Sequence, residues 1–205
     1  MAIRIKSMVM GPVATNCYYF YEEGNTQVVV IDPPVKGEWI HEHLKGRGLS
    51  VAAILFTHGH FDHISGANEL RDASGAKICA PLPEQEMLED PSLNLSDQNY
   101  SVRADRFLSD GEELLLAGIN VRVIFTPGHT SGGCCYYLEN EKTLFSGDTL
   151  FAGSVGRTDL PTGSHAQLIA SVKEKLMVLP DDVNVYPGHG ESTSIGEERK
   201  YNPFL

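Results

Sequence analysis

Three histidines and one aspartate lie within six consecutive positions of this chain, in the pattern H-x-H-x-D-H over residues 58–63. They follow residues 51–56, a continuous apolar run that predicts a strand buried on both faces. In a chain of this composition the pattern arises by chance in roughly one shuffled sequence in 1,500, so a merely histidine-rich loop is a poor explanation. The fold is therefore expected to hold this segment at the end of a strand, where a rigid sheet aims side chains into a cleft.

The residue types of this segment are those that bind transition metals. Imidazole and carboxylate together suit zinc, and also iron or manganese, whereas calcium and magnesium sites are built mainly from oxygen. In an extended loop, His58 and His60 can point the same way and share one ion. Asp62 and His63 come at the start of a predicted helix, where the backbone turns, and can reach a second ion. Gly59 is expected to relieve crowding where ligand-bearing turns converge.

Two metal ions need more ligands than this segment supplies, because a zinc ion in a protein takes three or four protein groups. Three further candidates each end a predicted strand and sit beside glycine: His129, Asp148 and His189. This is the setting of side chains that project from a sheet into a cleft. The sequence therefore predicts that these three side chains complete the site.

The order of the predicted elements favours a layered α+β fold. Strands are predicted over residues 3–10, 16–22, 27–31, 51–56, 77–80, 112–117, 120–126, 133–139, 143–147 and 184–186. Helices are predicted over residues 38–45, 64–74 and 84–89, from Ser164 through Leu176, and after Ser194, with residues 81–105 otherwise irregular. Two similar halves, with sheets inside and helices outside, predict a four-layer αββα sandwich in one domain over residues 1–205.

Charge and cysteine usage limit the partners and the compartment. The formal net charge is −11, which repels nucleic acid and anionic lipid, and no basic run offsets it. No apolar run approaches membrane-spanning length, and the first residues lack the apolar stretch of a signal peptide. The four cysteines form no C-x-x-C pair and are expected to be small buried hydrophobes. We therefore expect a cytoplasmic protein that binds neither nucleic acid nor membrane; a monomer is the simplest assumption.

The four metal-ligand blocks, in this order along nearly the whole chain, resemble the metallo-β-lactamase fold superfamily, particularly its glyoxalase II-like branch. The resemblance implies an αββα sandwich with a dinuclear metal site in a groove along the sandwich edge. It implies that one ion is held by His58, His60 and His129. It implies that the other is held by Asp62, His63 and His189, with Asp148 bridging both. Asp32, which ends an earlier strand, is expected to support a ligand rather than to bind metal.

Two branches of the superfamily fit these positions less well. Zinc β-lactamases commonly place a cysteine among the second-site ligands and lack the bridging aspartate, whereas this chain has Asp148. The flavodiiron relatives replace the second histidine of the first block with glutamate, whereas this chain has His60. Both differences favour the glyoxalase II-like branch.

The resemblance also implies a reaction. The two divalent ions are expected to be zinc, although iron or manganese would also fit these ligands. Two such ions can lower the pKa of a shared water to about 7 and polarise an acyl oxygen. Asp62 is expected to orient that water as well as to ligate. A thiolate with a pKa near 8.5 leaves without a strong general acid. The implied activity is hydrolysis of S-D-lactoylglutathione or a similar acyl-thiol, a small-molecule substrate.

The residues that bind the substrate in the long glyoxalase II enzymes are only partly matched in this chain. The long glyoxalase II enzymes carry a lysine and a tyrosine, two apart, shortly after the bridging aspartate, and add a helical C-terminal domain that grips glutathione. Here the corresponding stretch is Gly156-Arg157-Thr158-Asp159, and no separate C-terminal glutathione-binding domain is expected. Arg157 can bind a substrate carboxylate in the lysine's place, or it can merely pair with Asp159 and shape the loop. The pattern resembles the compact single-domain glyoxalase II-like hydrolases.

Two alternatives stay open at the level of sequence. Persulfide dioxygenases share the fold and the Gly-Arg-Thr-Asp stretch, but hold one iron through two histidines and an aspartate. They usually continue with Phe-Gln, whereas this chain continues with Leu160-Pro161. A relative that binds metal or a partner without catalysis is the other alternative, and the filled ligand positions count against it.

Overall fold

The N-terminal half of the chain forms a six-stranded sheet in the computed structural model, which describes residues 2–205. Its strands lie in chain order, β1 (Ile3–Met10), β2 (Thr15–Glu22), β3 (Gln27–Ile31), β4 (Ser50–Leu55), β5 (Lys77–Pro81) and β6 (Arg106–Leu108). The pairs from β1 to β3 are antiparallel and those from β3 to β6 are parallel. Strands β3, β4 and β5 are almost wholly apolar because both of their faces are covered.

The C-terminal half forms the second six-stranded sheet, in the spatial order β14-β13-β10-β9-β8-β7. Its strands are β7 (Glu113–Leu116), β8 (Ile119–Phe125), β9 (Cys134–Leu138), β10 (Thr143–Gly147), β13 (Asn184–Pro187) and β14 (Thr193–Ser194). Strands β10 and β13 pair in parallel, and the other neighbours are antiparallel. A small separate hairpin, β11 (Leu150–Phe151) with β12 (Ser154–Val155), follows β10.

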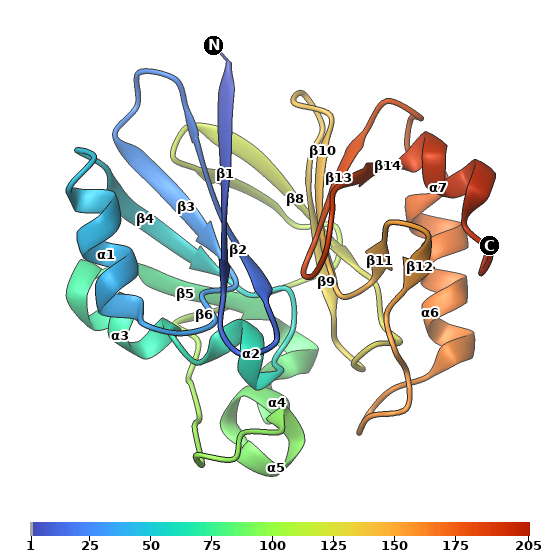
Figure 1. The fold of residues 1–205 in the computed structure, drawn as a ribbon, viewed down its shortest axis with the longest axis horizontal. Helices are drawn as coiled ribbons and strands as arrows, with labels where there is room; N and C mark the ends of the chain where they lie inside the picture. The colour runs from blue at the N-terminus through green and yellow to red at the C-terminus, as the bar shows by residue number, and fades with distance from the viewer. Residues whose placement is uncertain (1) are drawn as a thin grey trace.

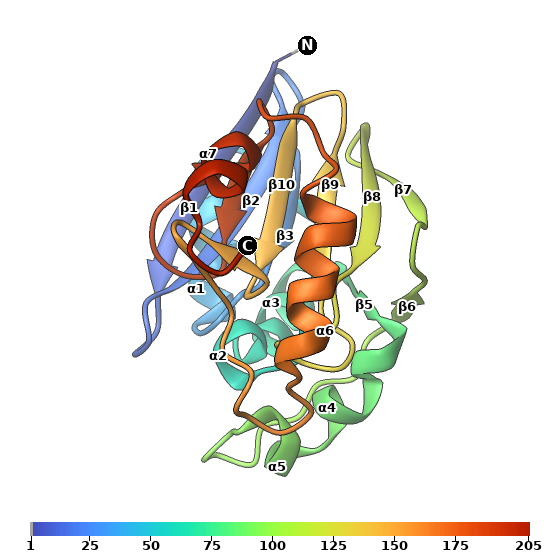
Figure 2. The ribbon, with the colours of Figure 1, turned by 90° about the vertical axis from the view of Figure 1, so that its right-hand side faces the viewer.

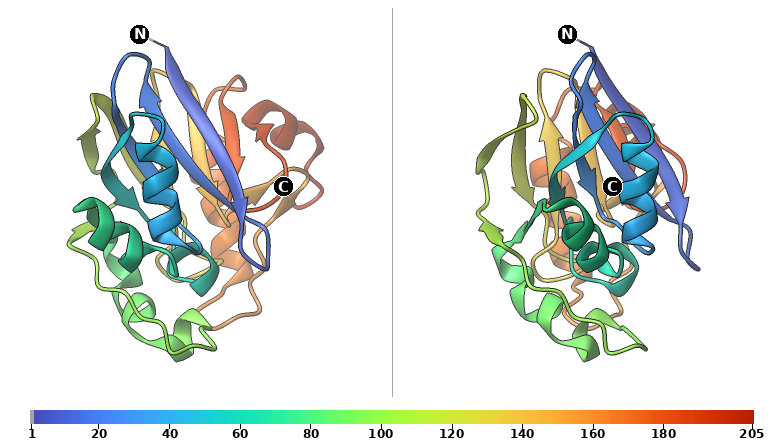
Figure 3. Two further views of the ribbon diagram at one scale, coloured as in Figure 1. Left: turned by 60° about the vertical axis from the view of Figure 1, so that its left-hand side comes forward. Right: turned by 90° about the vertical axis from the view of Figure 1, so that its left-hand side faces the viewer.

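The two sheets face each other, and helices cover their outer sides (Figure 1). Helices α1 (Gly37–Lys45) and α3 (Ala67–Ser74) lie over the first sheet (Figure 3). Helix α6 (His165–Ser171), its π-helical continuation η2 (Val172–Leu176) and α7 (Ile195–Tyr201) lie over the second sheet (Figure 2). The predicted αββα sandwich is confirmed.

Three apolar cores separate these four layers. The central core, between the sheets, contains large aromatic side chains such as Phe20, Tyr136 and Phe145. The two outer cores lie between each sheet and its helices. The adjacent Cys134 and Cys135 belong to different cores, because successive strand residues point to opposite faces. All four cysteines are buried and unpaired, as expected.

The prediction of one continuous helix over residues 64–74 is wrong, because the chain is interrupted between two helices there. The chain forms α2 (Phe61–Ile64) and then α3, with a break at Gly66. A side chain at Gly66 would lie 2.9 Å from the backbone of Val35, and the Gly66 N–H donates to Pro33 O at 2.9 Å. A tertiary contact therefore interrupts a segment whose local spacing is helical.

The region between β5 and β6 is more helical than predicted. It contains η1 (Leu82–Glu84, a 3₁₀ turn), α4 (Gln85–Glu89) and α5 (Pro91–Asn94). Among residues 2–205, no helix is long and apolar enough to cross a membrane.

The two sheets meet at one edge. There Thr15 forms an isolated bridge with His189, and the Asn16 N–H donates to Gly188 O at 2.8 Å.

Candidate metal centre

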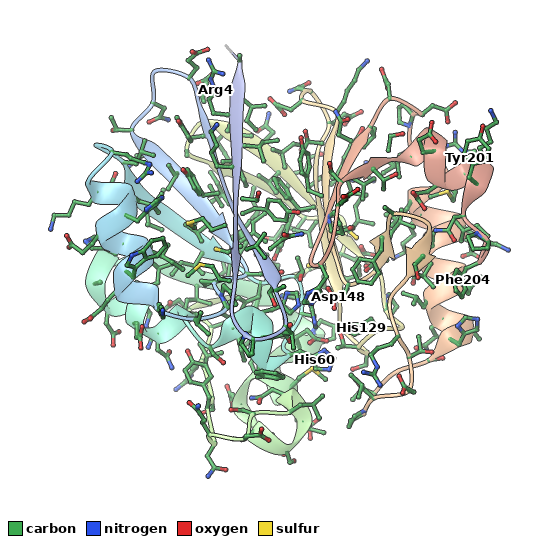
Figure 4. The ribbon with its side chains drawn as sticks, viewed as in Figure 1. Arg4, His60, His129, Asp148, Tyr201 and Phe204 are labelled. Carbon is green, nitrogen blue, oxygen red and sulfur yellow. The ribbon has the colours of Figure 1, made fainter. Side chains whose placement is uncertain are left out.

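All seven predicted ligands come together at this shared edge of the two sheets. The loop after β4 provides His58 and His60, helix α2 provides Asp62 and His63, and loops after β8, β10 and β13 provide His129, Asp148 and His189. Figure 4 labels three of them, His60, His129 and Asp148, which lie close together between the two halves of the molecule. The site therefore draws on both sheets, which is why its ligands are far apart in sequence.

The side chains form two groups, each with nitrogen or oxygen atoms within 4.8 Å of one another. One group is His58, His60 and His129; the other is Asp62, His63 and His189. Asp148 faces both: its Oδ2 lies 3.6 Å from His129 Nε2 and 3.5 Å from His189 Nε2. Its Oδ1 lies 3.5 Å from His63 Nε2. This is the division that the family resemblance implied.

Hydrogen bonds on the outer side fix the orientation of three histidines. Nδ1 of His63 lies 3.0 Å from Asp32 Oδ2, and Nδ1 of His129 lies 2.8 Å from the carbonyl oxygen of Arg157. Nδ1 of His58 lies 3.1 Å from Thr57 Oγ1, whose own proton goes to Asp32 Oδ2. These partners hold a proton on Nδ1 of each ring and direct Nε2 inward.

The inward atoms have the properties of metal ligands. Across residues 2–205, His58 Nε2, His63 Nε2 and Asp148 Oδ1 are buried yet lack a hydrogen-bond partner. Nδ1 of His60 lies 3.0 Å from His129 Nε2 and donates to it when no ion lies between them. Buried polar atoms without partners are costly, and a cation bound among them would satisfy them. The residues present therefore fit a pair of transition-metal ions.

Electrostatics prepare the first group to bind metal. Burial, reinforced by neighbouring histidines, lowers the pKa of His58 well below its usual value and lowers the pKa of His60 to about 3. Burial also lowers the pKa of His129. These imidazoles are therefore neutral at pH 7, the form that binds metal.

The second group is charged in the absence of metal. Burial alone would lower the pKa of His63, but the carboxylates of Asp62 and Asp148 outweigh it and raise that pKa to about 10. Burial alone would raise the pKa of Asp62, but His63 and hydrogen bonds from His189 and Thr15 outweigh it and lower that pKa. Without metal, the positive charge of the protonated His63 therefore balances the negative charges of Asp62 and Asp148.

Asp32 lies close enough to His58 and His63 to form a third possible ligand group. Its oxygens, however, already accept from the Thr57 N–H at 2.8 Å, the Thr57 hydroxyl at 2.6 Å and His63 Nδ1. The carboxylate therefore orients His63 and, through Thr57, His58. This is the supporting role that the resemblance implied for Asp32.

Sequence reasoning missed Glu84, a fully buried carboxylate at the end of η1. Its Oε2 accepts from the Gly59 N–H at 2.7 Å, and its Oε1 accepts from the Gly132 N–H at 2.8 Å. A side chain at Gly59 would meet Met87 Cγ at 2.8 Å and Glu84 Oε2 at 3.1 Å. Gly59 therefore makes room for the η1–α4 segment rather than for a second ligand-bearing turn. Glu84 ties the loop of His58 and His60 to the loop that follows His129.

Three other supporting hydrogen bonds come from β2, which the sequence did not connect with the site. The Thr15 hydroxyl donates to Asp62 Oδ2 at 2.9 Å. Asn16 Nδ2 and the Tyr18 hydroxyl both donate to Pro187 O at 2.9 Å, which anchors the loop that carries His189. A polar residue in a strand gives no signal of such a partner until the two sheets are placed together.

Arg157, the predicted substrate-binding residue, is held by its neighbour. Its Nε and Nη2 each donate to a different oxygen of Asp159 at 2.8 Å. Both side chains are more than half exposed, at 62% and 68%. The ion pair that the sequence left open as an alternative is therefore present, although Arg157 also lines the cavity over the metal centre.

That cavity has a volume of about 490 Å³. Its floor contains five of the seven candidate ligands: His60, Asp62, His129, Asp148 and His189. A groove of about 610 Å³ near β1 and α1 contains none of them. A small molecule can thus approach both ligand groups from the 490 Å³ cavity.

The fold and this metal-binding centre define a class, the metallo-hydrolases with an αββα sandwich. The chain belongs to the metallo-beta-lactamase superfamily, whose family model matches residues 10–189.

Two relatives match nearly the whole chain. The probable metallo-hydrolase YqgX of Bacillus subtilis is 36% identical over 205 residues, with 98% of this chain and 96% of the relative covered. The hydroxyacylglutathione hydrolase GloC of Haemophilus influenzae is 35% identical over 197 residues, with 93% and 92% covered. A glyoxalase II-like protein is thus among the relatives, as the sequence motifs suggested.

Three solved structures share the fold over 98% of this chain. The BLEG-1 B3 metallo-beta-lactamase has a TM-score of 0.93 at 38% identity, with 99% of its chain covered. TTHA1623 in a di-iron-bound form has a TM-score of 0.85 at 33% identity, with 100% covered. ETHE1 from Myxococcus xanthus has a TM-score of 0.79 at 29% identity, with 83% covered.

Proposed function

We propose that this protein is a dinuclear-metal thioester hydrolase of the glyoxalase II type, acting on S-D-lactoylglutathione or a similar acyl-thiol. The observation that carries the proposal is the position of Asp148, whose carboxylate faces both ligand groups at 3.5–3.6 Å. A carboxylate so placed can bridge two ions. The 35% identity to a hydroxyacylglutathione hydrolase supports the choice of substrate class.

We assign His58, His60 and His129 to one ion and Asp62, His63 and His189 to the other, with Asp148 shared. Zinc is our first choice for both ions because imidazole and carboxylate ligands suit it. Iron or manganese would also fit the same ligands. The di-iron-bound form of TTHA1623 gives iron particular weight as the alternative.

Bound in these positions, two divalent ions would supply hydroxide at neutral pH and would polarise the acyl oxygen of the substrate. The protein's part is positioning. Asp62 lines the cavity and is held by the Thr15 hydroxyl, so we assign it the orientation of the attacking water as well as ligation. The departing thiolate has a pKa near 8.5 and needs no strong general acid.

A mononuclear-iron oxygenase of the persulfide dioxygenase type is the second candidate. The similarity to ETHE1 leaves it open. Such a site needs only two histidines and one carboxylate. It would use three of the seven candidate ligands and leave the other four without a metal, and this is our reason for preferring the hydrolase.

The test is an assay of the metal-loaded protein with a panel of thioesters that includes S-D-lactoylglutathione, following thiol release and oxygen uptake together. Glutathione persulfide and a chromogenic β-lactam are assayed in parallel. We expect thiol release without oxygen uptake. Oxygen consumption on the persulfide, with no thioester hydrolysed, would identify the oxygenase, and cleavage of the β-lactam alone would identify a lactamase.

A further inference from the structure

The walls of the cavity over the metal centre are mostly apolar. Above the ligand floor they are formed by Val13, Phe61, Leu95, Phe151, Val155 and Leu160, together with Ser154 and Arg157. These side chains come from the β1–β2 turn, from α2, from the end of α5 and from the β11–β12 hairpin with the loop after it. Such walls favour apolar or uncharged groups, and Ser154 and Arg157 are the polar side chains that they offer a substrate carboxylate.

The cation that could receive a carboxylate is already neutralised. In the described part of the chain, Arg157 is the only lysine or arginine that lines this cavity. Its guanidinium makes two parallel hydrogen bonds to Asp159, the geometry in which arginine binds carboxylates most specifically. A substrate carboxylate would have to displace Asp159, which is tethered two residues away and therefore always at hand.

A second, smaller hollow of about 220 Å³ adjoins the first at Phe61 and Asp62. Its other walls are Gly11, two prolines, Val35, the polar side chains of Ser65, Ser96 and Gln98, and the carboxylate of Asp97. Among residues 2–205, no lysine or arginine lines it. An anionic arm of the substrate would therefore meet like charge there rather than a counter-ion.

We propose that, among acyl-thiols, this site prefers those whose arms beyond the thioester are uncharged and apolar, so that S-D-lactoylglutathione, whose carrier has free carboxylates, is a weaker substrate than an uncharged acyl-thiol. The proposal rests on the thioesterase function proposed above and narrows its substrate class. The Arg157–Asp159 ion pair is the specificity-determining element, because it engages the one lysine or arginine side chain, among residues 2–205, that lines the cavity.

The experiment compares one thioester with and without its carboxylates. The metal-loaded protein is given S-D-lactoylglutathione and its diethyl ester, and thiol release is measured for each. The acyl group and the sulfur are the same, so differences in chemistry are small. We expect kcat/KM to be about tenfold higher for the diester, mainly through a lower KM.

Asp159→Asn tests the role of the ion pair. The substitution releases the Arg157 guanidinium and should raise kcat/KM for the diacid about tenfold through KM, so that the preference for the diester is lost. Asp182→Asn, which breaks an exposed ion pair with Lys142 away from the cavity, is the matched control and should change neither substrate. Leu160→Gln should raise KM for the diester by inserting an amide into the apolar wall.

The outcomes separate this inference from the function on which it rests. If the wild-type protein hydrolyses the diacid faster than the diester, the inference is overturned while the thioesterase function stands. If Asp159→Asn leaves the diacid unchanged, the ion pair does not set the specificity. If neither ester releases thiol, the thioesterase function and the inference both fail.

Discussion

His63 and Asp32 form a contact that is almost completely removed from solvent: His63 Nδ1 lies 3.0 Å from Asp32 Oδ2, and the side chains are 0% and 3% exposed. The contact connects the loop after β3 to helix α2, and the two residues are 31 positions apart in the sequence. It fixes Nε2 as the nitrogen of His63 that faces Asp62 and Asp148. The affinity of that group for metal therefore depends on a residue that we do not count among the ligands.

Replacing Asp32 by asparagine should weaken metal binding without removing a ligand. The amide cannot accept all three of the hydrogen bonds that Asp32 accepts, so His63 loses its fixed orientation. We expect the affinity for the second ion to fall about 10- to 100-fold, as measured by competition with a chromophoric chelator. Glu198→Gln, which alters another buried carboxylate, is the control. An unchanged affinity in Asp32→Asn would contradict this role.

Replacing Glu84 by glutamine should destabilise the metal-free protein. One carboxylate oxygen becomes an NH₂ group that must face the N–H of Gly59 or of Gly132, so a buried donor is left unpaired. The expected loss in the free energy of unfolding is about 1–3 kcal/mol, measured by urea denaturation.

The matched control for this variant is Glu86→Gln, on the exposed side of helix α4. It should change the free energy of unfolding by less than about 0.5 kcal/mol. Equal stabilities for the two variants would show that Glu84 does not tie the ligand loops together.

Glu84 and Asp32 also show what the sequence could and could not predict. The H-x-H-x-D-H pattern predicts four of the ligands, and the other three each end a predicted strand beside glycine. Both signals are contained in a few consecutive residues. The contacts of Glu84 span 25 and 48 residues and start from the first residue of the short helix predicted over residues 84–89. No local pattern reports them, because they exist only once the loops are placed side by side.

The same reasoning explains the errors in the predicted fold. Strands β6, β11, β12 and β14 were not predicted, because two or three residues are too few to show an alternating pattern. The helix over residues 64–74 has helical spacing throughout, and only the approach of Val35 to Gly66 shows why it breaks. The longer strands and the layer order were predictable because their apolar periods are long.

A methyl group at Gly188 should disturb the shared carboxylate. The Cβ of Gly188→Ala would lie 2.2 Å from Asp148 Oδ1 and 2.8 Å from His63 Cε1, so Asp148 must move. We expect kcat to fall about 100-fold, as is typical when a reacting geometry shifts by an ångström, together with loss of bound metal. The assay is thiol release at saturating substrate.

Gly190→Ala is the control for this variant, because it lies in the same loop. Its backbone φ of +75° strains any side chain, but nothing lies within 4 Å of the added Cβ. It should lose about 1–2 kcal/mol of stability and keep its metal. If both variants keep the metal and the activity, Gly188 is not needed for the approach of Asp148.

Metal uptake should release protons at pH 7. In the metal-free protein the pKa of His63 is about 10: burial alone would lower it, but the carboxylates of Asp62 and Asp148 outweigh burial. Since pH 7 lies below that value, His63 carries a proton that a metal ion must expel. The apparent affinity should therefore rise with pH up to about 10. The measurement is zinc addition to metal-free protein in weak buffer with a pH indicator.

The neutral histidines of the first group should add little to this release, because the pKa values of His58, His60 and His129 are all lowered. A solution that stays at constant pH on zinc addition would contradict the protonated state of His63. So would an affinity that falls as the pH rises from 7 to 9.

The central claim is that Asp148 holds two metal ions together in one site. The most direct measurement is the number of ions bound per folded chain, obtained by native mass spectrometry of the wild-type protein and of Asp148→Asn after zinc loading. We predict two ions in the wild-type protein and fewer than two in the variant. A single ion in the wild-type protein, or two ions held equally well by Asp148→Asn, would contradict the dinuclear site.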